Sequence, residues 1–67
     1  MPLNNTVKIQ RAKLGINQGK LGELAGVSRQ TISSIEGGEY NPSITLVLKL
    51  ATIFDTSVEE IFTYEED

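Results

Sequence analysis

Four polar side chains share one face of a short predicted helix. Ile32 and Ile35 are three positions apart within residues 29–36, so a helix that buries both turns its opposite face outward. That outward face carries Arg29, Gln30, Ser33 and Ser34. Arginine can donate two hydrogen bonds to O6 and N7 of guanine, and glutamine can pair with N6 and N7 of adenine. A solvated polar face has the same composition, so the residue types alone leave both interpretations open.

The residue types that catalysis and metal binding commonly use are missing. The chain has no histidine and no cysteine, which removes the commonest general base, the thiol nucleophile and the usual metal ligands. Glu59 and Glu60 are adjacent carboxylates, but neighbours on a helix do not converge on one substrate atom. The serines have no histidine to activate them. We therefore predict that the protein is not an enzyme and uses no metal or cofactor.

The charges are divided unequally along the chain. The formal net charge is −3. Residues 1–35 contain five cations and one acid and carry +4, whereas residues 36–67 contain one cation and eight acids and carry −7. Such a dipolar molecule can turn a basic face to phosphate while an acidic half keeps it in solution. An acidic tail that only promotes solubility is the alternative.

The outward polar face is predicted to belong to a helix-turn-helix over about residues 18–36. Asn17 can cap a helix over residues 18–25 that turns Leu21 and Leu24 inward. Gly26 suits the positive φ of a tight turn before the helix over residues 29–36. Two helices joined by a short glycine-containing turn form the DNA-binding helix-turn-helix arrangement.

A further helix is predicted before this unit. Asn4 or Asn5 can cap it, Val7 and Leu14 lie two turns apart along it, and Gly15 can end it. A chain of 67 residues has room for one domain only. We therefore assign residues 1–67 to a single domain.

Two more helices are predicted after this unit. Ser43 can cap a helix that runs to about Phe54 and is strongly apolar, through Ile44, Val47, Leu48, Leu50, Ala51 and Phe54. This helix is predicted to be the central hydrophobic support. Ser57 and Glu60 can form a capping box for a short helix that ends near residues 61–62. Residues 62–64 are either a short strand or a frayed end.

The spacing of these residues resembles the helix-turn-helix domain of the phage repressor and Cro family, also called the XRE family. The residues that carry the resemblance are Arg11, Gly15-Ile16-Asn17-Gln18, Leu21, Gly26-Val27-Ser28-Arg29-Gln30-Thr31-Ile32, Ile35-Glu36, Gly38, Tyr40-Asn41-Pro42-Ser43, Leu50-Ala51, Phe54 and Glu59-Glu60-Ile61-Phe62. The resemblance implies an all-α, five-helix domain like that of lambda repressor, with a short terminal strand as an optional addition.

The resemblance also implies roles for individual residues. Base edges would be read by Arg29, Gln30 and Ser34, with Ser33 beside them. Phosphates would be contacted by Gln18, Ser28, Thr31, Tyr40 and Asn41. Arg11 and Glu36 match a partly buried ion pair that joins the first helix to the third, and we interpret this pair as structural rather than as a direct DNA contact.

The chain departs from the family pattern at a few positions. Gly19, Lys20 and Gly22 stand where many relatives have a carboxylate and an alanine, and Glu39 replaces a common lysine. The glycines and the lysine would make the second helix less stable, and Glu39 would remove one phosphate contact. These departures bear on affinity rather than on fold.

The leading hypothesis is a cytoplasmic repressor that binds a palindromic double-stranded operator as a homodimer. Self-association is assigned to the acidic C-terminal end, through Ile61, Phe62 and Tyr64. The alternative is that the rings of Phe62 and Tyr64 complete the monomer core. A chain without a sensor domain would be regulated by its own concentration or by a separate protein partner. An antitoxin-type interaction module, in which DNA binding is secondary, is the second hypothesis. No segment approaches the ~20 apolar residues that cross a bilayer.

Overall fold

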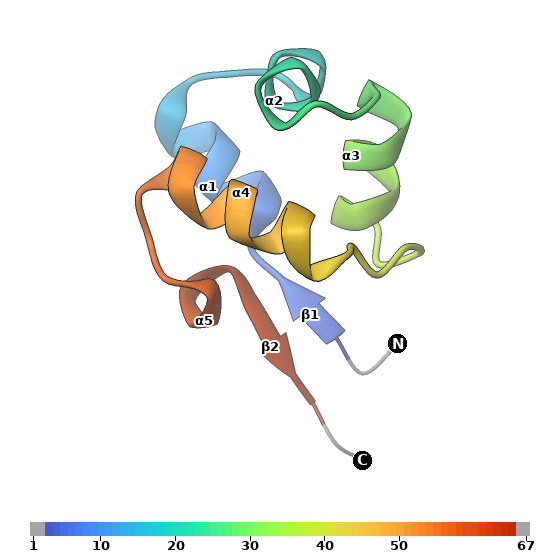
Figure 1. Ribbon diagram of the computed structural model, residues 1–67, viewed down its shortest axis with the longest axis vertical. Coiled ribbons are helices and arrows are strands. Elements are labelled where there is room, and N and C mark those ends of the chain that lie inside the picture. Colours follow the sequence, from blue (N-terminus) through green and yellow to red (C-terminus); the bar gives the residue numbers. More distant parts are fainter. Residues whose placement is uncertain (1–2, 66–67) are drawn as a thin grey trace.

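The computed structural model describes residues 3–65, so residues 1–2 and 66–67 of the predicted domain lie outside it. Five helices and two short strands follow in the order β1 (Leu3–Asn5), α1 (Val7–Leu14), α2 (Gln18–Ala25), α3 (Arg29–Glu36), α4 (Ile44–Phe54), α5 (Val58–Ile61) and β2 (Phe62–Tyr64). The two strands pair antiparallel, with Leu3 opposite Tyr64, so the two ends of the described chain lie side by side (Figure 1). The predicted five-helix fold is confirmed, and the two-stranded sheet is added to it.

Helix α4 crosses the middle of the molecule and supplies the centre of the core (Figure 1). Its buried side chains are Leu46, Val47, Leu50 and Phe54. They pack in one cluster with Val7, Leu21, Ala25, Ile32, Ile35, Ile61 and Phe62. The central support was predicted correctly, although Ile44 and Leu48 of the same helix are exposed rather than buried. No helix among residues 3–65 is long and apolar enough to cross a membrane.

Helices α2, α3 and α4 begin at the predicted caps and use their side chains, whereas α1 begins after Thr6 rather than at Asn4 or Asn5. The side chain of Asn17 accepts a hydrogen bond from the N–H of Lys20 at 2.8 Å, and Ser43 accepts one from Leu46 at 3.2 Å. These bonds satisfy N–H groups that have no partner within the helix. Ser57 makes no such side-chain bond, so the predicted capping box at α5 is wrong. A four-residue helix that leads directly into β2 forms without it.

Residues 3–5 form a strand where the sequence predicted the start of a helix. Asn5 still acts as a local cap, because its Oδ1 accepts the N–H of Val7 at 3.1 Å. The N–H of Thr6 donates to the carbonyl of Ile61 at 2.8 Å and continues the contact between the two chain ends. The frayed end considered for residues 62–64 is therefore wrong, since these residues pair with β1. A three-residue strand is too short to show a periodicity, and its partner is distant in sequence.

Two leucines lie at the surface: Leu14, an apolar position of the predicted first helix, and Leu24, which was predicted to face inward. Leu14 is 46% exposed and Leu24 is 50% exposed. The inner face of α1 is filled by Val7 and by Gln10, a buried polar residue. The inner face of α2 is filled by Leu21 and by two small buried residues, Gly22 and Ala25.

Candidate nucleic-acid interface

The turn between α2 and α3 is tight because one residue of α2 has no side chain. A Cβ added at Gly22 would lie 2.7 Å from the carbonyl oxygen of Val27, closer than real Cβ atoms approach. The N–H of Val27 in turn donates to the carbonyl of Gly22 at 2.9 Å. Gly26 adopts φ 77° at the end of α2, a conformation that favours glycine. These contacts fix the orientation of α3 relative to α2.

The start of α3 is held by two hydroxyl groups. Ser28 Oγ accepts the N–H of Thr31 at 3.1 Å, and the two hydroxyl oxygens lie 3.0 Å apart. Ser28 is exposed and Thr31 is half-buried. Of the two predicted phosphate contacts, Ser28 therefore caps α3 and Thr31 supplies the N–H that it caps, while both hydroxyl groups lie near the surface.

The outer face of α3 carries the predicted base-reading residues. Ile32 and Ile35 are fully buried beneath it. Arg29, Gln30 and Ser33 are exposed, and Ser34 is half-buried. The helix therefore presents two long polar side chains in its first turn and two short hydroxyls after them.

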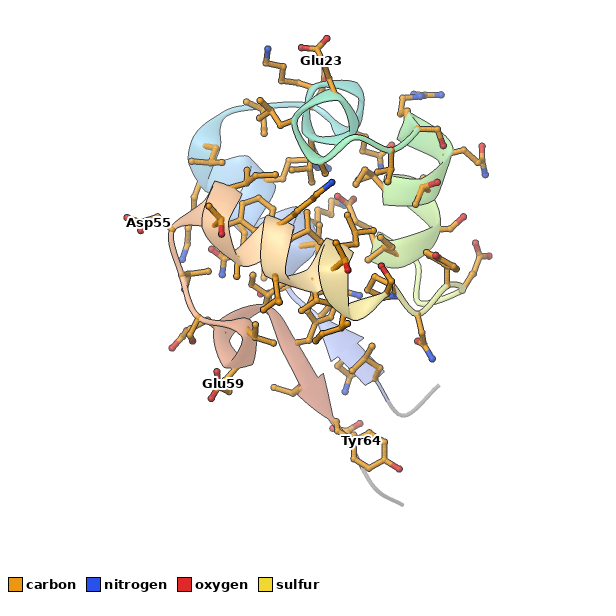
Figure 2. The ribbon with its side chains drawn as sticks, viewed as in Figure 1. Glu23, Asp55, Glu59 and Tyr64 are labelled. Atoms are coloured by element: carbon orange, nitrogen blue, oxygen red, sulfur yellow. The ribbon has the colours of Figure 1, made fainter. Side chains whose placement is uncertain are left out.

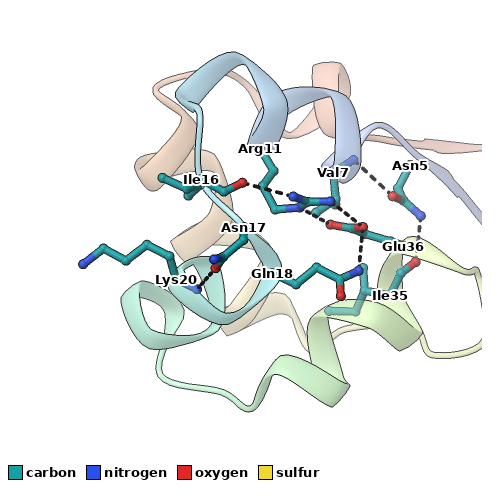
Figure 3. A network of polar contacts seen from close by, with 9 residues as sticks. All are labelled: Asn5, Val7, Arg11, Ile16, Asn17, Gln18, Lys20, Ile35 and Glu36. Atoms are coloured by element: carbon teal, nitrogen blue, oxygen red, sulfur yellow. Dashed lines mark hydrogen bonds and ion pairs between the residues drawn. The ribbon is translucent and has the colours of Figure 1, made fainter.

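Arg11, Glu36 and Gln18 form one polar network between α1, α2 and α3 (Figure 3). Arg11 donates from Nε to Glu36 Oε2 at 2.8 Å and from Nη2 to Glu36 Oε1 at 3.3 Å. Gln18 Nε2 donates to the same Oε1 at 3.1 Å. The two charged side chains are 16% and 7% exposed. The expected ion pair is thus present, and it includes a third residue that was predicted only as a phosphate contact.

The pKa values of the ion pair follow from these contacts. Burial acts to raise the pKa of Glu36, but hydrogen bonds from Arg11 and Gln18, with the charges of Arg11 and Lys8, lower it below the ordinary value. The hydrogen bond to Glu36 raises the pKa of Arg11 further. Glu36 is therefore an anion at neutral pH, and Arg11 neutralises it.

A polar hollow lies beside this network, at the start of α2. It is lined by Arg11, Asn17, Gln18, Gly19 and Arg29. The N–H groups of Lys20 and Leu21 bond to Asn17, whereas within residues 3–65 the N–H groups of Gln18 and Gly19 have no acceptor. Backbone N–H groups at a helix start favour anions. The hollow can therefore bind an anion such as a phosphate group.

The remaining predicted contacts lie at two separate places. Tyr40 and Asn41 are exposed on the loop that follows α3, where the N–H of Glu39 bonds to the carbonyl of Ser34 at 2.9 Å. Of the residues predicted for self-association, Ile61 and Phe62 are 1% and 8% exposed and therefore belong to the monomer core. Tyr64, which is 70% exposed, is the one predicted association residue that lies at the surface.

Some acidic side chains lie away from the outer face of α3, but Glu39 is exposed on the loop directly after this helix. Asp55 and Glu59 project from the side of the molecule opposite α3, and Glu23 projects from α2 (Figure 2). Glu36, the acid at the end of α3, is neutralised by Arg11. Asp55 and Glu59 are thus remote from α3, whereas Glu39 adjoins it.

Sequence reasoning missed the role of Asn5 at this site. Its Nδ2 donates to the carbonyl of Ile35 at 2.9 Å while its Oδ1 caps α1. One amide thus ties β1 to the last turn of α3. An asparagine before an apolar helix signals the cap, but a carbonyl 30 positions away has no signal in the sequence.

Comparisons with known proteins give a consistent result. The sequence model of the helix-turn-helix family HTH_3 matches residues 7–61. The uncharacterised HTH-type transcriptional regulator YgzD of Bacillus subtilis is 46% identical over 97% of this chain and 98% of its own length. The P22 c2 repressor, solved in complex with a synthetic operator, superposes with a TM-score of 0.76 at 34% identity and covers 79% of this chain and 80% of that one. The restriction-modification controller protein C.AhdI of Aeromonas hydrophila gives 0.74 at 33% identity, covering 81% of this chain and 78% of that one.

Proposed function

The chain belongs to the helix-turn-helix family of DNA-binding transcriptional regulators, of the XRE type, and from this premise we propose that it is a sequence-specific repressor. Helix α3 enters the major groove of double-stranded DNA. Arg29 and Gln30 read base edges there, with Ser33 and Ser34 in close approach. The observation that carries the proposal is the outer face of α3, which is polar and exposed above two fully buried isoleucines.

Phosphate contacts on both sides of α3 set its position on the duplex. Gln18 and the free N–H groups at the start of α2 hold one phosphate in the polar hollow. Ser28 and Thr31 contact the backbone from the start of α3, and Tyr40 and Asn41 from the loop after it. Contacts of this kind fix register without reading sequence.

Operator binding takes place as a twofold dimer on two half-sites about one helical turn apart. The similar P22 c2 repressor is a repressor whose structure holds an operator. In this chain the exposed Tyr64, at the end of the two-stranded sheet, is the proposed association residue. Dimerisation doubles the number of base contacts and makes operator occupancy depend on protein concentration.

An antitoxin-type interaction module is the second candidate function. The net charge of −7 on residues 36–67 favours it, because that half suits a basic protein partner. Affinity capture from the native source separates the two candidates. A toxin recovered in equal amounts with the protein supports the module, and its absence supports the repressor.

Selection from random DNA duplexes tests the leading proposal. The folded protein is expected to enrich one sequence with inverted half-sites, because base contacts from α3 distinguish operator from non-operator DNA by several kcal/mol. A pool that stays random after repeated rounds, with the protein shown to be folded, would exclude sequence-specific binding.

A further inference from the structure

The carboxylate of Glu36 makes one bond more than its ion pair requires. Two N–H groups of Arg11 already satisfy the bidentate pair, which is the usual arrangement of a guanidinium on a carboxylate. The third donor is Gln18 Nε2, from the first residue of α2. The acid at the end of α3 therefore also holds a side chain at the start of α2.

This bond decides how the Gln18 amide is oriented. An ionised carboxylate only accepts hydrogen bonds, so the nitrogen of the amide and not its oxygen must face Glu36. The nitrogen has two N–H groups, and one remains for a second acceptor. Gln18 lines the polar hollow, so this N–H is available to a group bound there.

We infer that Glu36 is a positioning residue for phosphate binding: it fixes the Gln18 amide so that its free N–H serves the anion in the polar hollow. This inference rests on the proposed phosphate contact of Gln18. A free glutamine side chain loses several rotamers when it binds a ligand. A side chain already held by Glu36 has lost them on folding, and the affinity for DNA rises accordingly.

Two features let an acid occupy this place beside a phosphate. Arg11 neutralises Glu36, so the carboxylate does not repel the anion. Arg11 Nη1 also donates to the carbonyl of Ile16 at 3.0 Å, just before the cap residue of α2. The ion pair thus holds both the chain entering α2 and the first side chain of that helix (Figure 3).

A double-mutant cycle on DNA affinity tests the inference. The wild type, Gln18→Ala, Glu36→Gln and the double variant are titrated with one duplex at one salt concentration by fluorescence anisotropy. Glu36→Gln is expected to weaken binding about three- to tenfold. In the Gln18→Ala background the same change is expected to have no further effect, because the side chain that it positions is gone. Equal losses in both backgrounds would overturn the inference.

Two further variants separate positioning from charge and from folding. Glu36→Asp keeps the charge that pairs with Arg11 but withdraws the acceptor by one methylene, and it is expected to show the same coupling to Gln18. Glu23→Gln removes an equal charge from the exposed surface of α2 and is expected to show no coupling. Circular dichroism confirms that each variant is folded at the temperature of the titration.

The cycle also distinguishes failure of the inference from failure of the proposed function. If Gln18→Ala binds every duplex like the wild type, Gln18 holds no phosphate and the inference is overturned, while base reading by α3 stands. If the folded wild type binds no duplex at all, the proposed function itself is overturned.

Discussion

At the scale of single residues, the proposed interface includes side chains that already have a partner within the protein. Gln18 bonds to Glu36, and Ser28 and Thr31 bond to each other. Each retains hydrogen-bonding capacity for DNA. Arg29 and Gln30, by contrast, are exposed and free to adapt to base edges. The fixed side chains suit phosphate positioning and the free ones suit base reading.

The pH dependence of stability follows from the ion pair. Because the pKa of Glu36 is lowered in the folded protein, its contribution is complete above the unfolded value of about 4.3 and is lost as the pH falls through the lowered folded value. Glu36→Gln is expected to cost roughly 1–3 kcal/mol at pH 7. Urea denaturation should show that this difference from the wild type shrinks below about pH 4. A difference that is constant from pH 7 to pH 3 would contradict the assigned role.

At the scale of elements, the helices were predictable and the sheet was not. The bounds of α2 and α3 follow from Asn17, Gly26 and Ser28, since caps and positive-φ turns are local chemistry. The strand pairing of residues 3–5 with residues 62–64 depends on the rest of the fold. The same distinction applies at the site, where exposure of the outer face of α3 was predictable but the bond from Gln18 to Glu36 was not.

Two glycines of α2 are expected to respond oppositely to the same substitution. Gly22→Ala places a Cβ against the carbonyl of Val27 and should destabilise the protein by about 1–3 kcal/mol. Gly19→Ala is the matched control, because a Cβ at Gly19 meets only side chains at 3.4 Å or more. It should stabilise the protein by up to about 1 kcal/mol. Thermal unfolding of the two variants measures the signs, and a stabilised Gly22→Ala would show that the turn is looser than described.

At the scale of the whole molecule, the proposed DNA-reading face of α3 and the proposed association residue Tyr64 lie at separate places. Helix α3 and the hollow beside it contain the groups suited to DNA, while Asp55 and Glu59 lie on the opposite side (Figure 2). Tyr64 extends from the sheet that joins the chain ends. A protein with this arrangement can bind DNA through one surface and a second copy of itself through another.

Two exposed tyrosines test this separation. Tyr64→Ala is expected to raise the dimer dissociation constant at least tenfold in sedimentation, because an exposed aromatic ring is a typical interface anchor. Tyr40→Ala, in the loop after α3, should leave association unchanged and weaken binding to all duplexes alike. If both variants associate like the wild type, Tyr64 is not part of the dimer interface.

The central claim is that the outer face of α3 reads base edges, and Arg29 tests it most directly. Affinities are measured for the selected operator and for duplexes that differ from it by one base pair. Arg29→Ala is expected to lose about 1–3 kcal/mol on the operator and to become indifferent at one position. Arg29→Lys keeps the charge without the two-donor geometry and should lose the same preference. An Arg29→Ala variant that binds the operator like the wild type, with every base preference intact, would contradict the claim.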